Sequence, residues 1–195
     1  MKKAHIMLII GIITFVAVGC NQPVPDIEDL SYEDIINNQY GNPSAAMEAD
    51  KILWKKIINE KEAVLLFLNR ENTTSAARIA NIGDEYKASV SAPVGGSGDE
   101  AISWQWSLLC RPPAETNPEV AAIVWGYIYS PDVEKVLVGS HDTATSFEEA
   151  QILQFDEYNI RLYYFLTDDE TGLDYDTIAA YDTLGNILYS NRDLE

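Results

Sequence analysis

The sequence predicts an α+β protein in which one N-terminal amphipathic helix precedes a mostly antiparallel β-sandwich or partly closed barrel of about nine strands. Apolar residues recur at helical spacing over residues 45–60, whereas from residue 62 onward they alternate or form short continuous runs. Short polar turns join these runs, and no helical segment alternates with them. This order favours an antiparallel meander over a parallel sheet.

The chain is strongly acidic. Its 195 residues include 13 Lys and Arg against 31 Asp and Glu, a formal net charge of −18, and 47% of them are hydrophobic. That apolar content is ordinary for one globular domain with a sizeable core. A field of this sign repels nucleic acid and anionic lipid headgroups, which argues against nucleic-acid binding. It favours a basic partner or divalent cations, or it serves only as a solvated surface.

The N-terminal residues have the pattern of a secretory leader. Lys2 and Lys3 precede thirteen uncharged residues, 6–18 (IMLIIGIITFVAV), which are too few for the roughly 20 apolar residues of a membrane-spanning helix. The run ends in residues 17–20 (AVGC). This stretch resembles the lipobox of bacterial lipoproteins, in which a small residue directly precedes a cysteine, although Ala17 stands where leucine is usual.

The resemblance covers about the first tenth of the chain and implies a lipid anchor. Residues 1–19 would be a removed signal peptide, and Cys20 would carry diacylglycerol and hold the protein on the outer face of the cell membrane, in a host taken as Gram-positive. An ordinary secreted protein cleaved near Gly19 and an uncleaved N-terminal anchor are the alternatives. Cleavage would leave 11 of the 13 basic residues against 31 acidic ones, a formal charge of −20.

Residues 20–43 are predicted to be the lipidated cysteine and an acidic tether with a short helix. The stretch 21–30 (NQPVPDIEDL) holds two prolines and three acids, which is a linker composition. Ser31 then caps a short helix that ends at the Gly-Asn-Pro of residues 41–43. Residues 44–195 form a single globular β-rich domain.

That domain is expected to begin with the amphipathic helix over residues 45–60. Its apolar stripe consists of residues spaced as on one helix face, with lysines and a glutamate toward the other side; the stripe comprises Ala46, Ala49, Leu53 and Ile57, widened by Trp54 and Ile58. We expect this helix to pack on the sheet that follows.

The strands are expected to fill the rest of the chain. Residues 63–68 and 120–129 are apolar on both faces, which predicts buried strands, and residues 102–110 alternate. Gly83 and Asp84 are expected to join one hairpin, and Gly185, suited to positive φ, another. Residues 134–138 are expected to return as the hairpin partner of residues 120–129. The other strands cover residues 75–81, 86–91, 149–155, 158–167, 175–181 and 186–189.

Rows of aromatic side chains are the candidate binding site. Trp104 and Trp106 are expected to share one strand face, and Trp125, Tyr127 and Tyr129 to share another. A third set consists of Tyr163 and Phe165. Such rows can bind sugar rings or extended peptides through flat apolar contact. The same rows are also typical of a sandwich core, so the pattern leaves both interpretations open.

Nothing in the sequence nominates a catalytic residue, a metal site or a cofactor. His141 is the only histidine after the leader, and its neighbours Ser140 and Asp142 cannot converge with it as a triad requires. Cys110 is expected to be a buried small hydrophobe without a disulfide partner. The acidic loop around Gly172 lacks the spacing of an EF-hand, which leaves a solvated turn or a weak cation site.

The sequence therefore favours a non-enzymatic lipoprotein whose extracytoplasmic domain binds a protein or a cell-envelope polymer. Two alternatives remain open. A cell-envelope hydrolase would need two carboxylates that face each other across a cleft, at least one of them with a raised pKa. A small-ligand carrier of the barrel type would need an enclosed apolar cavity, whereas an interaction module would need an exposed aromatic or apolar patch.

Overall fold

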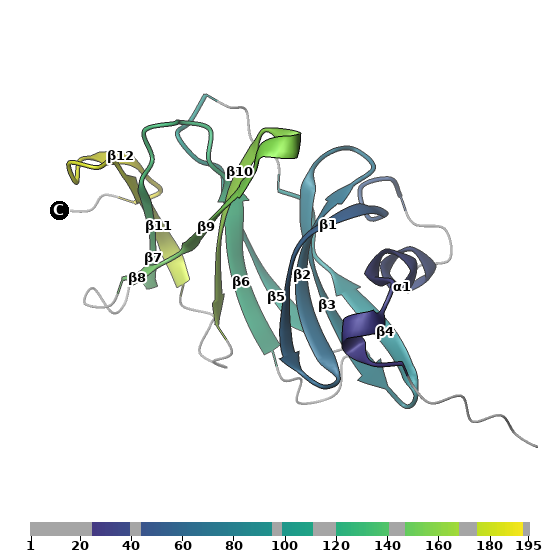
Figure 1. Ribbon diagram of the computed structural model, residues 1–195. Coiled ribbons are helices and arrows are strands. Elements are labelled where there is room, and N and C mark those ends of the chain that lie inside the picture. The colour runs from purple at the N-terminus through teal and green to yellow at the C-terminus, as the bar shows by residue number, and fades with distance from the viewer. Residues whose placement is uncertain are drawn as a thin grey trace, which may run out of the picture.

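The computed structural model describes residues 25–39, 44–94, 99–110, 120–140, 147–167 and 175–192. These residues form a short N-terminal helix and three four-stranded antiparallel sheets stacked side by side (Figure 1). We call them the first, middle and outer sheets, counted away from the helix. Within the described part of the chain, no helix is long and apolar enough to cross a membrane.

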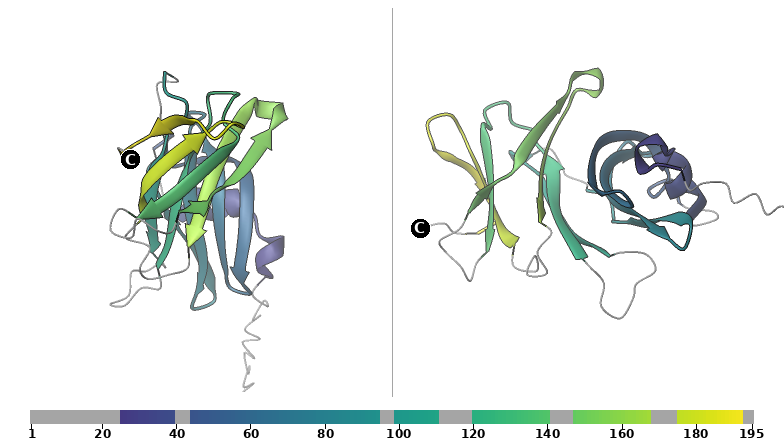
Figure 2. Two further views of the ribbon diagram at one scale, coloured as in Figure 1. Left: turned by 90° about the vertical axis from the view of Figure 1, so that its left-hand side faces the viewer. Right: turned by 60° about the horizontal axis from the view of Figure 1, so that its bottom comes forward.

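The N-terminal helical segment covers one face of the first sheet. A 3-10 turn, η1 (Ile27–Asp29), precedes helix α1 (Tyr32–Gln39), which confirms the short helix expected after Ser31. The buried side chains of Ile27, Tyr32 and Ile36 pack on the sheet, and the Tyr32 hydroxyl donates to the Ile27 carbonyl over 2.5 Å. The first sheet curves around this segment (Figure 2).

The first sheet consists of β1 (Ala49–Asn59), β2 (Glu62–Asn69), β3 (Thr74–Ile82) and β4 (Glu85–Val90), in that order. Every residue of β2 is buried, which confirms the prediction that this segment is apolar on both faces. Leu65 and Phe67 point toward α1, whereas Val64 and Leu66 point toward the middle sheet.

The predicted helix over residues 45–60 is wrong, because this segment is strand β1 after a single turn at residues 44–48. Three register shifts against β2 interrupt its alternation. As a result Ala49, Ile52 and Ile57 face α1, whereas Trp54 and Ile58 face the middle sheet. Each bulge adds a residue and changes which face the next side chain takes, so the apolar spacing imitates a helical period. The β-branched and aromatic residues of the segment suit a strand.

The middle sheet has the order β5-β6-β10-β9 and the outer sheet the order β12-β11-β7-β8. The middle sheet is formed by β5 (Gln105–Cys110), β6 (Val120–Tyr127), β10 (Ile160–Thr167) and β9 (Gln151–Phe155). The outer sheet is formed by β12 (Ile187–Ser190), β11 (Tyr175–Tyr181), β7 (Lys135–Ser140) and β8 (Glu148–Glu149). The expected mostly antiparallel β-rich fold is confirmed, but the described strands form three open sheets, none of them closed into a barrel.

The middle sheet is buried on both faces, which explains the doubly apolar pattern of β6. One face packs on the first sheet through Ile123 and Trp125, and the other packs on the outer sheet through Val124. Neighbouring side chains along a strand point to opposite faces, so a central strand of a sheet that lies between two others needs apolar residues on both faces.

Two expected hairpins are confirmed and one is wrong. Gly83 and Asp84 both have positive φ and join β3 to β4, and Gly185 (φ +84°) lies in the turn between β11 and β12. Strand β7 pairs with β11 and β8 instead of returning to β6. Both edges of β6 are already occupied, by β5 and β10, so the chain after Ser130 has to continue into the next layer.

Several features noted in the sequence lie outside the described residues. They are Cys20 with the whole leader, the segment around His141 and the acidic loop at residues 168–174. The lipid anchor on Cys20 stays a prediction.

Candidate functional site

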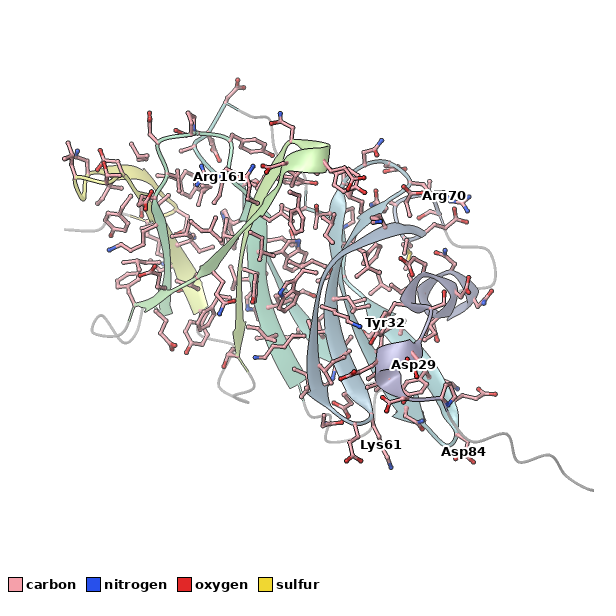
Figure 3. The ribbon with its side chains drawn as sticks, viewed as in Figure 1. Asp29, Tyr32, Lys61, Arg70, Asp84 and Arg161 are labelled. Atoms are coloured by element: carbon pink, nitrogen blue, oxygen red, sulfur yellow. The ribbon has the colours of Figure 1, made fainter. Side chains whose placement is uncertain are left out.

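A pocket of about 490 Å³ lies between the first and middle sheets at one end of their strands. We call it the tyrosine pocket. Its wall comes from the end of β2 and the turn after it, the segment that follows β4, the end of β6 with the residues just beyond it, and the turn that leads into β10. The lining residues are Leu68, Asn72, Thr73, Val94, Tyr127, Tyr129, Tyr158 and Ile160. Arg70, two residues before Asn72, and Arg161, directly after Ile160, mark this end of the molecule in Figure 3.

Two stacked tyrosines form the aromatic wall of the pocket. The ring centroids of Tyr127 and Tyr129 lie 5.9 Å apart, with 16° between the ring planes. The Tyr127 hydroxyl accepts a hydrogen bond from the Thr74 Oγ1 over 2.7 Å. Burial raises the pKa of Tyr127, and the hydrogen bond from Thr74 partly opposes that shift. Tyr127 is therefore a fixed, neutral ring that supports Tyr129.

The backbone beyond β6 holds Tyr129 at the pocket. Its amide donates to the Ala101 carbonyl over 2.9 Å, and the Ile128 amide donates to the Arg161 carbonyl over 2.9 Å. The Arg161 guanidinium donates to the Ser130 and Val133 carbonyls, at 3.3 and 2.8 Å. Tyr129 is nevertheless 37% exposed. Its backbone is therefore fixed while its ring reaches the surface.

A buried asparagine shapes the opposite wall. The Asn69 side chain donates to the Ala46 carbonyl over 2.8 Å and to the Thr73 hydroxyl over 2.7 Å. Its Oδ1 accepts from the Glu71 and Thr73 amides, both at 3.0 Å. These four bonds fix the turn that presents Asn72, whose φ is +57°. Asparagine is one of the few residues that adopt such a left-handed conformation readily.

The lining has no formal charge. None of the described residues that line the pocket is Asp, Glu, Lys or Arg, so it offers hydroxyl and amide groups beside apolar side chains. Arg70, on the same turn, is engaged by Glu48 at 2.7 Å. A pair of facing carboxylates, which the hydrolase alternative requires, is therefore not part of this pocket.

The five aromatic residues predicted as a binding face do not lie on one face. Gln105 pairs with Trp125 and Trp106 with Val124, which places the two tryptophans on opposite sides of the middle sheet. Trp125 is fully buried against the first sheet, and Trp106 packs toward the outer sheet. Trp104 is 37% exposed. Trp125 and Tyr127 share the face toward the first sheet, but of these five residues only Tyr127 and Tyr129 line the tyrosine pocket.

The remaining lining residues were missed by the sequence reasoning. Asn72 and Thr73 lie in a turn, Tyr158 in the 3-10 turn η2 (Asp156–Tyr158), and Val94 next to a glycine-rich loop. They come from three segments far apart in the chain, and no local pattern connects them. Only the positive φ at Asn72 leaves a signal, since Asn is enriched in such turns.

A second pocket, of about 400 Å³, lies at the other end of the first sheet. It is lined by Pro25, Asp26, Glu60, Lys61, Asn81, Asp84 and Tyr86. The Tyr86 hydroxyl contacts the Pro25 carbonyl at 3.4 Å, which attaches the start of the described chain to this end. Lys61 and Asp84 mark it in Figure 3, opposite Arg70.

No group of three or more His, Cys, Asp and Glu side chains that could hold a metal ion is found among the described residues. In comparisons with known proteins, no family model, no curated protein and no solved structure matches this chain.

Proposed function

We propose that the chain is a membrane-anchored lipoprotein whose extracytoplasmic domain binds a cell-envelope polymer or an envelope protein through the tyrosine pocket. The observation that carries this proposal is the stacked pair Tyr127 and Tyr129, in which a half-buried, hydrogen-bonded ring supports an exposed one. Aromatic rings held in this way offer a flat contact surface that loses little conformational freedom on binding.

The position of the tether supports the same proposal. Pro25 lies beside Lys61 and Asp84, whereas the tyrosine pocket lies at the opposite end of the strands. The eight residues of β2 run between these two ends, a distance of roughly 25 Å at a rise of about 3.4 Å per residue. A lipid on Cys20, five residues before Pro25, would hold the membrane within about 18 Å of the tether end. The pocket would then open away from the membrane.

Retention on envelope material tests the proposal. We expect the full-length protein, extracted in detergent, to be retained by purified cell-wall sacculi or to co-purify with one membrane protein of its host. Tyr129→Ala should weaken that retention about tenfold, because it removes the exposed ring. Trp104→Ala is the matched control, since Trp104 is also 37% exposed and lies away from the pocket lining.

Equal retention of the wild type, Tyr129→Ala and Trp104→Ala would contradict a role of the tyrosine pocket. Release of soluble wall fragments during the incubation would instead replace the binding proposal with the hydrolase alternative.

A further inference from the structure

We infer that the tyrosine pocket takes a neutral, polyhydroxylated ring, namely an uncharged sugar unit of an envelope polymer. This inference rests on the proposed function and specifies its ligand. It is carried by the combination of a fixed aromatic platform, neutral polar groups around it and the net negative charge of the whole chain.

The platform suits the C–H face of a sugar ring. Tyr127 covers one side of Tyr129 at a centroid distance of 5.9 Å, and the 37% exposure of Tyr129 leaves part of that ring open to a ligand. Leu68, Val94 and Ile160 add apolar walls. The weakly polarised C–H groups of a sugar ring pack well against such flat apolar surfaces.

The polar groups of the pocket suit hydroxyls. Asn72 contributes an amide, with both donors and acceptors, and Tyr158 and Thr73 contribute hydroxyl groups. The Thr73 hydroxyl accepts from the Asn69 Nδ2, so it donates its own proton in another direction. Each of these groups can donate and accept, as a ligand rich in hydroxyls requires. The volume of about 490 Å³ falls within the range of small-ligand pockets, about 300–1,000 Å³.

Charge argues for a neutral ligand. The whole chain carries a formal charge of −18, which opposes an anionic ligand, and none of the described lining residues is a cation that could compensate. None of the described lining residues is a carboxylate that could hold a cationic group either. A phosphate-rich polymer and an amino sugar without its acyl group are both disfavoured for this reason.

An extended peptide is disfavoured by the backbone around the pocket. Peptides that bind by strand addition need free amides and carbonyls at a sheet edge. Here the Val94 amide donates to the Thr74 carbonyl over 2.8 Å, and the Asn69 amide to the Thr73 carbonyl over 2.9 Å. The pocket therefore recognises its ligand through side chains.

Three sugar trimers that differ in charge test the inference. Full-length protein in detergent is titrated by calorimetry with neutral tri-N-acetylchitotriose, with its cationic deacetylated form and with anionic trigalacturonate. We expect the neutral trimer to bind at least about tenfold more tightly than either charged trimer. Tyr129→Ala should lower its affinity about tenfold, and Trp104→Ala should leave it unchanged.

A second variant checks the polar wall. Asn72→Gly removes the amide but suits the positive φ at this position, so the turn should keep its shape. We expect weaker binding of the neutral trimer with an unchanged melting temperature. If the Asn72→Gly variant and the Tyr129→Ala variant each bind the neutral trimer as tightly as the wild type does, the inference is overturned.

The outcomes separate the inference from the proposed function. If a charged trimer or a wall peptide binds in place of the neutral sugar, while retention on envelope material still depends on Tyr129, the ligand class is wrong and the proposed function stands. If no trimer binds and no envelope material retains the protein, both are wrong.

Discussion

At the scale of single residues, a buried ion pair joins two strands of the first sheet, and its arginine also contacts the middle sheet. The Arg78 Nη2 lies 2.6 Å from the Glu62 Oε2, and the two side chains are only 5% and 3% exposed. The Arg78 Nη1 also donates to the Leu109 carbonyl of β5 over 3.2 Å. Buried charges of this kind are tolerated only when they are paired, so removal of one partner is far more damaging than removal of both.

Arg78→Met should therefore lower the free energy of unfolding by about 3–5 kcal/mol, because the Glu62 carboxylate remains buried without its arginine. The double variant Arg78→Met with Glu62→Gln should recover much of that loss. Denaturant unfolding measures both. Arg70→Met is the matched control, because the Arg70 side chain, which pairs with Glu48, is 59% exposed. We expect this variant to change the free energy of unfolding by less than about 1 kcal/mol. Similar losses for Arg78→Met and Arg70→Met would contradict the argument.

A second prediction at this scale concerns alkaline pH. Burial holds the pKa of Tyr163 well above its usual value of 10.0, and nearby Tyr189 raises it further. The unfolded chain therefore loses this proton at a lower pH than the folded protein does. The contribution of Tyr163 to the free energy of unfolding should be fully present below pH 10, and it should fall as the pH rises beyond that value.

Tyr163→Phe should remove that part of the alkaline loss. It should also cost about 1 kcal/mol at neutral pH, because the Tyr163 hydroxyl donates to the Ser103 carbonyl over 2.9 Å. Unfolding curves recorded between neutral pH and pH values above 10 measure both effects. Identical alkaline slopes for the wild type and Tyr163→Phe would show that Tyr163 does not cause the loss.

At the scale of elements, the close approach of β6 to the segment before β5 determines the position of the pocket tyrosines. A Cβ placed on Gly126 would lie 1.8 Å from the Ser103 carbonyl oxygen. The Tyr127 amide donates to the Ser103 Oγ over 3.0 Å, and the isolated bridge between Ile102 and Ile128 continues the pairing. Glycine at position 126 is therefore needed for β6 to carry Tyr127 and Tyr129 to the pocket.

Gly126→Ala should destabilise the protein by about 3 kcal/mol or more, because rigid backbone has to move. Gly139→Ala is the comparison. There the added Cβ meets the Phe147 ring at 2.7 Å, and that side chain can rotate away. We expect a clearly smaller loss for Gly139→Ala in thermal unfolding, and equal losses would contradict the backbone contact.

The elements also show where sequence patterns mislead. The pattern of β2 predicted a strand correctly, since a short continuous apolar run depends only on burial of both strand faces. The pattern of β1 did not, because bulges shifted the phase of its apolar residues. For Trp106 and Trp125 the pattern left a binding face and a core both open, and the register between β5 and β6 places them in two separate cores.

At the scale of the whole molecule, the three stacked sheets place the candidate pocket and the tether at opposite ends. Asn72 lines the pocket, and Asp84 lines the second pocket beside Pro25. Both residues are exposed turn residues with positive φ, so cysteine substitutions at the two sites should disturb the fold alike.

Energy transfer to a headgroup-bound acceptor in vesicles tests the proposed anchor. In a Cys110→Ser background, a fluorescent donor is attached to the cysteine of either Asp84→Cys or Asn72→Cys. Energy transfer to the membrane acceptor should be more efficient from Asp84→Cys, because the proposed lipid lies near the Asp84 end. In the Cys20→Ser protein both signals should disappear. Stronger transfer from Asn72→Cys would show that the pocket faces the membrane.

The sequence by itself determined the local features: the short helix after Ser31, the burial of both faces of β2 and β6, and the turns at Gly83 and Gly185. Each depends on chain neighbours or on burial, which composition and spacing record. Only the tertiary structure decided that β1 is a strand, that β7 joins the outer sheet, and that Tyr127 and Tyr129 meet Asn72 in one pocket. Those outcomes depend on bulges, strand register and occupied sheet edges, which are properties of strand pairs far apart in the chain.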